Sequence, residues 1–219
     1  MDVLAGIVAR TPTPGRPALV GVDGVDGSGK TIFAANLAGA YARSGRNALV
    51  VHEDDFLNPR AVRHRLGPDS PEGFFRDSYN LAALTSKVLD PLAHGGEARI
   101  VPADFDFRAD TPRDCEPIAV PRDGVVIVEG MFLHRDELAE RWDLSVFLDV
   151  PFAETARRMA QRDGSNPDPE HPSMRRYILG QRHYLSLCRP RRRATFVIDN
   201  TDPLAPRITV TVDDPIDGD

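Results

Sequence analysis

The sequence predicts an α/β fold built on a five-stranded parallel sheet. Short apolar runs recur along the chain, as expected for strands that are buried on both faces of a sheet. Helical segments lie between these runs, which is the pattern of parallel strands joined by crossover helices. A glycine-rich loop follows the first run, where open parallel sheets bind ligands. The five runs are residues 18–22, 48–52, 125–128, 144–149 and 195–199.

The remaining elements follow in chain order. Residues 1–17 are expected to form a short helix and then a Pro/Gly-rich link into the first strand. Residues 97–122 hold two short β signals around a loop, which indicates an inserted β-hairpin. Residues 163–175 are polar and rich in proline and glycine, which is typical of a mobile lid. Residues 208–212 alternate and could add an edge strand. The helices expected are 30–43, 81–93, 135–141, 151–163 and 172–187.

The glycine-rich loop matches a phosphate-binding motif. Residues 24–31 read GVDGSGKT, the G-x-x-x-x-G-K-[ST] pattern of a P-loop. Glycines let the backbone curl so that successive N–H groups face phosphate oxygens, and the N-terminus of the next helix also favours anions. Lys30 can reach the β- and γ-phosphates, and the Thr31 hydroxyl suits Mg²⁺. The motif therefore predicts ATP and Mg²⁺ as cofactors and a P-loop NTPase-type three-layer sandwich. The candidate cofactor-binding residues are Gly24, Asp26, Gly27, Ser28, Gly29, Lys30 and Thr31.

Acidic residues follow two of the other predicted strands. The segment 52–56 reads HEDDF and comes directly after the second strand, and Glu129 ends the third apolar run. Because the carboxyl ends of parallel strands meet at one edge, these acids are expected near the P-loop. A carboxylate after the second strand could accept the proton of an attacking hydroxyl, bind Mg²⁺, or do both. Spacing alone leaves Asp54 and Asp55 as alternatives. Glu129 is a second candidate Mg²⁺ ligand.

Arginines gather on the helix expected before the lid. Arg158 and Arg162 are four residues apart, so they share one helix face,. Arginines supplied in cis can stabilise the negative charge that develops during phosphoryl transfer. A closing lid would bring them in only with substrate, which limits wasteful hydrolysis. The alternative interpretation is a solvent-exposed basic helix paired with Glu154 and Asp163.

The composition limits the class of protein. The chain of 219 residues is 41% hydrophobic and shows no internal repeat, so residues 1–219 are expected to form one domain,. A net charge of −6 argues against a nucleic-acid-binding role,. No apolar run approaches the roughly 20 residues that span a bilayer, so no membrane partner is expected. Cys115 and Cys188 form no metal or disulfide pattern, which favours a cytoplasmic location.

Five motifs in order resemble those of the uridine kinase family, in the branch that also holds phosphoribulokinase and type I pantothenate kinase. They are GVDGSGKT (24–31), DDF (54–56), FDF (105–107), VIVEG (126–130) and RRMAQRD (157–163). The resemblance covers about residues 18–203. It implies a five-stranded parallel sheet with helices on both faces, and ATP and Mg²⁺ as cofactors.

The resemblance also implies residue roles. Asp54 matches the catalytic base, Glu129 a magnesium-site residue, and Asp106 a residue that contacts the ribose. Lys30, Arg158 and Arg162 complete the catalytic set. Phe56 and Arg108, close to these acids in sequence, are further candidate acceptor contacts. Departures from the family fall where the acceptor is recognised. Leu57 and Phe105 stand where the family usually has tyrosine, and residues 131–135 read MFLHR where aromatic residues help to form the nucleoside pocket.

These observations predict an ATP-dependent kinase that acts on a hydroxyl of a small molecule. The favoured acceptor is the 5′-hydroxyl of a uridine- or cytidine-like nucleoside. A pantothenate-like or sugar-like alcohol is the alternative, and a non-catalytic nucleotide-binding regulatory module is the alternative from another class. A GTPase switch is disfavoured because Asn200-Thr201-Asp202 lacks the lysine of the guanine-binding N-K-x-D element. Assembly into a homo-oligomer is left open.

Overall fold

The fold is organised around one six-stranded sheet. The computed structural model describes residues 2–211. The strand order is β10-β9-β8-β1-β7-β2, with β10 antiparallel to β9 and all other neighbours parallel. The strands are β1 (Ala18–Gly24), β2 (Ala48–His52), β7 (Val125–Gly130), β8 (Leu144–Asp149), β9 (Phe196–Asp199) and β10 (Arg207–Thr211). The predicted parallel core and added edge strand are confirmed. Residue 212 of the predicted edge strand lies outside the described residues, as do positions 1 and 213–219 of the single domain that we predicted.

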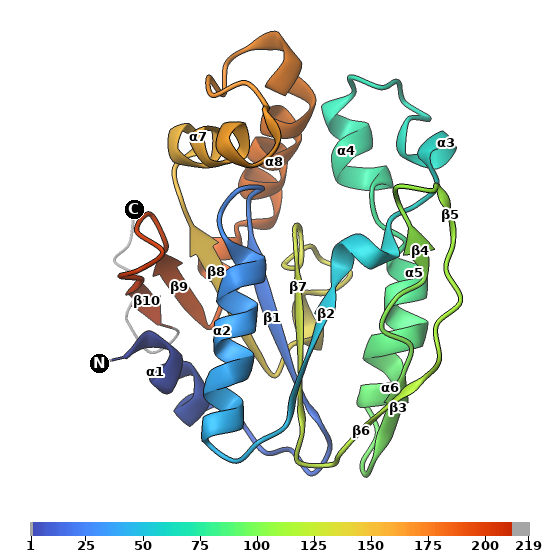
Figure 1. The fold of residues 1–219 in the computed structure, drawn as a ribbon, viewed down its shortest axis with the longest axis vertical. Helices are drawn as coiled ribbons and strands as arrows, with labels where there is room; N and C mark the ends of the chain where they lie inside the picture. Colours follow the sequence, from blue (N-terminus) through green and yellow to red (C-terminus); the bar gives the residue numbers. More distant parts are fainter. Residues whose placement is uncertain (1, 212–219) are drawn as a thin grey trace.

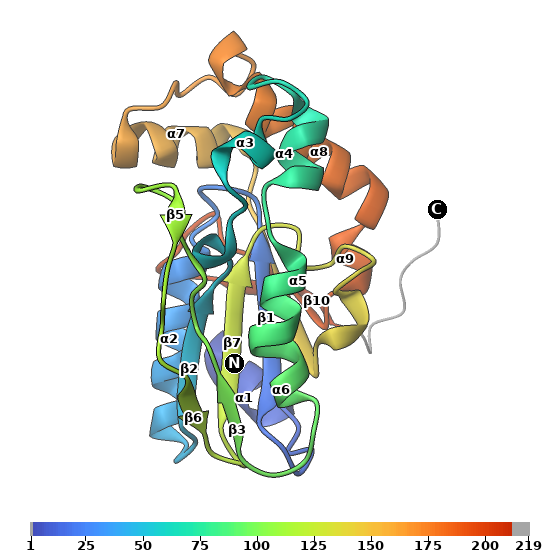
Figure 2. The ribbon, with the colours of Figure 1, turned by 90° about the vertical axis from the view of Figure 1, so that its right-hand side faces the viewer.

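Helices cover both faces of the sheet (Figures 1 and 2). On one face lie α1 (Val3–Arg10) and α2 (Lys30–Arg43). On the other lie α5 (Leu81–Leu84), a π-helical turn (Thr85–Leu89) and α6 (Asp90–Leu92). The described part of the chain, residues 2–211, has no helix long and apolar enough to cross a membrane.

Side chains of the central strands alternate between two separate cores. In β1, Leu19 packs with α5 and α6, whereas Val20 packs with α2. In β7, Val126 and Ile127 divide in the same way. Because both sets are buried, each strand must be apolar at nearly every position, which is why these strands read as short continuous hydrophobic runs.

The insert contains more structure than we predicted. β3 (Ala98–Ile100) and β6 (Ile118–Val120) pair antiparallel, which confirms the hairpin. Between them, β4 (Phe105–Asp106) and β5 (Thr111–Pro112) form a second short ribbon. This ribbon rises toward the carboxyl edge of the sheet, beside the segment that follows β2 (Figure 1).

Two groups of helices stand above the carboxyl edge (Figure 1). One group consists of α3 (Arg60–Arg63) and α4 (Pro71–Asp77), and the other of α7 (Phe152–Asp163) and α8 (Arg175–Cys188). The predicted lid joins α7 to α8 and contains one 3₁₀ turn at Pro172–Met174. The movement of this lid stays a prediction. A short α9 (Pro190–Arg193) precedes β9.

One helix prediction is confirmed with a local change, and another is wrong. The helix expected at 81–93 is continuous from residue 81 to residue 92, with a π-helical turn at Thr85–Leu89 inside it. The helix at 135–141 is wrong, because only a 3₁₀ turn forms, at Ala139–Arg141. The chain reverses at Phe132, which has a φ of 68°, and the backbone N–H and ring of His134 are both held by the buried Asp23 carboxylate. These contacts fix a turn where the local sequence favoured a helix.

Helix α4 was not predicted, although it carries a start signal. Pro71 occupies its first position, and the Ser70 hydroxyl accepts a hydrogen bond from the Gly73 N–H at 3.0 Å,. The helix packs closely against α8 at Gly180. A β-carbon at Gly180 would lie 2.8 Å from Phe74 Cδ1 and 2.8 Å from the Pro71 carbonyl oxygen. The absence of a side chain at Gly180 therefore sets the distance between the two helix groups.

Replacing Gly180 by alanine should lower the free energy of unfolding by about 1–3 kcal/mol, because the added methyl overpacks this contact. Gly39→Ala is the matched control. Gly39 also lies inside a 14-residue helix, where an added methyl would meet only Arg43 Nη1 at 3.5 Å. That control should gain about 0.5–1 kcal/mol in stability from helix propensity. Urea unfolding measures both changes, and a stabilising effect of Gly180→Ala would contradict the close packing.

Candidate functional site

The P-loop joins β1 to α2 with the geometry that anion binding requires. Gly27 and Gly29 have φ values of 76° and 93°, which favour glycine, and α2 begins at Lys30,. Neither glycine has room for a side chain, since an added β-carbon would meet the Thr155 carbonyl oxygen at 2.7 Å or Asn200 Nδ2 at 2.9 Å. The loop is therefore fixed both by its own conformation and by its neighbours.

Glu129 and Thr31 lie together at the start of α2. The Thr31 hydroxyl donates to Glu129 Oε1 at 2.9 Å, and His52 Nδ1 lies 2.6 Å from the same oxygen. The hydrogen bond with Glu129 raises the pKa of His52. Burial by itself would raise the pKa of Glu129, but His52, Lys30 and Thr31 together hold it below its usual value. Glu129 is therefore an anion with a hydroxyl oxygen beside it, a pair that suits a hard cation.

Among residues 2–211, no group of three or more histidine, cysteine, aspartate or glutamate side chains is arranged to hold a metal ion. Mg²⁺ does not require such a group, because it usually takes one or two protein carboxylates and completes its shell with waters and substrate phosphates. The residues that fit this role are Thr31 and Glu129, with Asp54 nearby.

Asp54 and Asp55, which spacing could not separate, have different surroundings. Asp54 lines a cavity of about 160 Å³ beside the P-loop, and one of its oxygens accepts a hydrogen bond from the Tyr79 hydroxyl at 3.0 Å. Loss of surrounding water raises the pKa of Asp54, against the opposing effects of Lys30 and Tyr79. Asp55 instead pairs with Arg113 at 3.6 Å and is not part of the cavity lining. Of the two acids, Asp54 is the one in position to meet a ligand.

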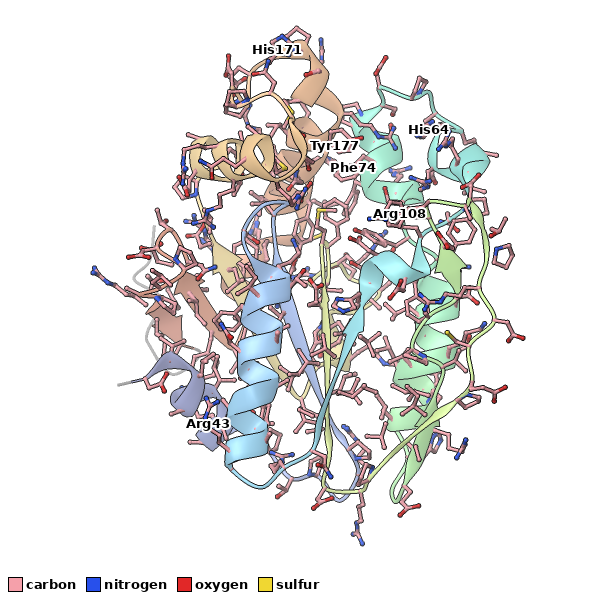
Figure 3. The ribbon with its side chains drawn as sticks, in the orientation of Figure 1. Arg43, His64, Phe74, Arg108, His171 and Tyr177 are labelled. Carbon is pink, nitrogen blue, oxygen red and sulfur yellow. The ribbon has the colours of Figure 1, made fainter. Side chains whose placement is uncertain are left out.

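The walls of the cavity next to Asp54 combine apolar and aromatic side chains with polar and charged ones. Phe74 of α4 and Tyr177 of α8 pack edge to face with ring centroids 5.1 Å apart, and Figure 3 shows them together in the space between the two helices. His64, which follows α3, stands to one side of this pair (Figure 3). The other lining residues are Asp26, Leu57, Arg63, Ser78, Tyr79, Phe107, Met131 and Arg176.

Three predicted acceptor contacts do not line this cavity. Phe56 is fully buried in the core beneath it. Asp106 is exposed, and its carboxylate accepts hydrogen bonds from the backbone N–H groups of Arg108 and Ala109, which lower its pKa. Arg108 lies over the ring of Phe107 on the outer ribbon. The ribbon thus brings Phe107, rather than Asp106 or Arg108, to the cavity.

The two arginines of α7 that were predicted to act in catalysis, Arg158 and Arg162, have different environments. Arg158 is tied to backbone, because it donates to the carbonyl oxygens of Gly27 at 3.3 Å, Asn200 at 3.0 Å and Thr201 at 2.8 Å. Arg162 is 58% exposed and pairs with Asp163 at 2.8 Å and with Asp26 at 3.4 Å. Arg158 therefore braces the P-loop, and Arg162 is freer to move toward a ligand.

A second cavity, of about 120 Å³, adjoins the other side of the P-loop. Gly29, Arg158 and Asn200 form part of its wall, and Ile32, Phe33 and Pro203 contribute apolar surface. Its position beside the phosphate-binding loop fits the base of a nucleotide.

Sequence reasoning missed several residues that shape the site. Gln181 of α8 accepts a hydrogen bond from the Asp26 N–H at 2.6 Å, and Asn200 donates to the Ser28 carbonyl oxygen at 2.8 Å. Single amides in a helix and a loop give no sequence signal. Tyr79 and Phe74 lie at the boundary between core and cavity, because both belong to a buried aromatic cluster and both line the cavity.

Comparisons with known proteins point in one direction. No protein-family model matches the sequence. A uridine kinase of Deinococcus deserti is 30% identical over 196 residues, which cover 84% of this chain and 87% of that protein. Nicotinamide riboside kinase 1 of Rattus norvegicus is 28% identical over 156 residues, 69% of each chain. Among solved structures, a possible uridine kinase from Bacillus stearothermophilus matches with a TM-score of 0.67 and 25% identity, covering 90% of this chain and 95% of that one.

Replacing Tyr79 by phenylalanine should raise the pKa of Asp54, because the lost hydroxyl donates to the ionised carboxylate and favours it. The phenylalanine ring keeps the packing against Phe132, whose centroid is 6.2 Å away. Carbon-13 NMR titration of the Asp54 carboxyl group measures the shift. Tyr177→Phe is the control, since Tyr177 lines the same cavity without bonding to Asp54. An unchanged or lower pKa in Tyr79→Phe would contradict the assigned hydrogen bond.

Proposed function

Because the chain belongs to the uridine kinase family of P-loop kinases, we propose that it transfers the γ-phosphate of ATP to the 5′-hydroxyl of a nucleoside. The observation that carries the proposal is the position of Asp54. Its carboxylate lines a cavity whose wall also includes Asp26 of the P-loop, so a hydroxyl in that cavity can meet both a proton acceptor and a bound phosphate.

The donor end uses the P-loop and its surroundings. The backbone N–H groups of the loop and the Lys30 ammonium bind the phosphates, and the second cavity takes the base. Thr31 and Glu129, with Asp54 close by, would hold Mg²⁺. When bound, this ion neutralises charge on the β- and γ-phosphates. The cytoplasmic location and any homo-oligomer stay predictions.

The acceptor end supplies proton transfer and positioning. Phe74, Tyr177 and Met131 offer flat apolar surface, which suits the ring of a nucleobase. Asp54 takes the proton of the acceptor hydroxyl as the new bond from oxygen to the γ-phosphorus forms. The bond from that phosphorus to the bridging oxygen breaks, and ADP leaves with the bonding electrons. Arg162 can stabilise the transferring group, while Arg158 keeps the P-loop rigid.

An acceptor screen tests the substrate class. We expect ADP release above background with uridine, cytidine or nicotinamide riboside, and background rates with pantothenate and fructose. Coupled detection of ADP, with mass spectrometry of the phosphorylated product, measures the reaction. Turnover of pantothenate or fructose without turnover of any nucleoside would overturn the nucleoside assignment and leave the kinase assignment in place.

Asp54→Asn tests the proposed base. We expect kcat to fall by about 100- to 10,000-fold, the usual contribution of a positioned general base, while ATP binding measured by calorimetry stays close to that of the wild type. Asp55→Asn is the matched control, because the neighbouring acid pairs with Arg113 outside the cavity. Full turnover by Asp54→Asn, or an equal loss in Asp55→Asn, would show that the base is assigned wrongly.

A further inference from the structure

Asp26 is a P-loop residue whose side chain lines the acceptor cavity. In a P-loop motif this position varies, and only its backbone is used for phosphate binding. Here the Asp26 side chain is 30% exposed and lines the acceptor cavity together with Asp54. Asp26 and Asp54 are the two carboxylates of that lining.

The backbone of Asp26 is held from behind. Its N–H donates to Gln181 Oε1 at 2.6 Å, and Gln181 is only 1% exposed. Gln181 is itself fixed, because its amide donates to the Tyr177 carbonyl oxygen at 3.0 Å. The peptide of Asp26 is thus anchored to α8, and the carboxylate is presented to the cavity by a rigid support.

The Asp26 carboxylate has unused capacity to accept hydrogen bonds. Within the described chain its side-chain partner is Arg162, at 3.4 and 3.5 Å, which is longer than the roughly 2.7–2.9 Å of a strong charged hydrogen bond. An ionised carboxylate offers about four acceptor sites. The oxygens of Asp106, by contrast, already cap the backbone of the ribbon outside the cavity.

The Asp26 carboxylate adds a negative charge to the wall of the cavity. Asp26 stands beside a loop that binds phosphate anions, and like charges within a few ångströms repel. Its charge also raises the pKa of Asp54 and of Tyr79, as a smaller contribution than burial. Arg162 offsets part of this charge but is itself exposed. A hydroxyl donor bound in the cavity would satisfy the carboxylate.

We propose that Asp26 is a specificity-determining residue that accepts a hydrogen bond from a second hydroxyl of the acceptor, next to the hydroxyl that Asp54 deprotonates. The inference rests on the proposed function and narrows the acceptor to an alcohol with at least two nearby hydroxyl groups, such as an intact ribose. It assigns to Asp26 the task that the family resemblance implied for Asp106.

The test compares acceptors that differ by one hydroxyl. For the wild type, kcat/KM should fall by about 10- to 100-fold from uridine to either 2′-deoxyuridine or 3′-deoxyuridine, as expected for loss of one hydrogen bond to a charged group. Asp26→Ala should lose about the same factor with uridine and show no further loss with that deoxy analogue.

Two variants keep the test decisive. Asp26→Asn preserves the shape of the side chain, so if Asp26→Ala fails to bind ATP, the same comparison is made with Asp26→Asn. Asp106→Ala examines the rival residue and should retain the full discrimination between uridine and its deoxy analogues. The proposal is overturned if Asp106→Ala removes the discrimination, if the Asp26 variants keep it, or if they raise the KM for ATP instead.

Failure of the nucleoside assignment gives a different result. In that case uridine is not turned over at all, and the comparison is repeated with the alcohol that the acceptor screen identifies and its analogue lacking one other hydroxyl. Retained discrimination in the Asp26 variants, or an acceptor with a single hydroxyl, would then overturn the role of Asp26 by itself.

Discussion

The parallel pairing of β1 with β7 is the constraint on which the site depends. The pairing sets Val22 opposite Glu129 and Asp23 opposite Gly130, so the P-loop and the acid of the next strand leave the sheet at the same level. Both strands are buried on both faces, which fixes the register because a slip would expose apolar side chains or bury polar ones. The bond between Thr31 and Glu129 at 2.9 Å is a direct consequence.

The acceptor cavity depends less on strand pairing than the phosphate-binding edge does, because most of its walls lie outside the sheet. Phe74 and Tyr177 come from two helices that meet at Gly180, and Phe107 comes from the inserted ribbon. Segments of this kind can vary without disturbing the phosphate-binding edge. One family can therefore keep its donor chemistry while its acceptors differ, as the names of the uridine and nicotinamide riboside kinases among the relatives illustrate.

Acidic groups are concentrated where the phosphates would bind. Besides Asp26, Asp54 and Glu129, the fully buried Glu53 lies behind Asp54 with both oxygens lacking a hydrogen-bond partner, and burial raises its pKa well above the usual range. Asp23 is satisfied by His134, Tyr184 and the Gly24 N–H. The raised pKa of Glu53 and the internal partners of Asp23 leave Asp26, Asp54 and Glu129 as the carboxylates that Mg²⁺ and a polyhydroxy acceptor would meet,.

The sequence by itself determined the donor half of this protein. Apolar runs specified the parallel strands, and the P-loop, Glu129 and the acids after β2 followed from short motifs, because these features depend on local backbone geometry and on strand order. The family resemblance already favoured Asp54 over Asp55, and the tertiary structure alone placed Asp54 and Asp26 in the cavity lining and Asp106 outside it. Those outcomes depend on where α4, α8 and the ribbon pack, and contacts such as Gln181 with Asp26 join residues 155 positions apart, which no local pattern encodes.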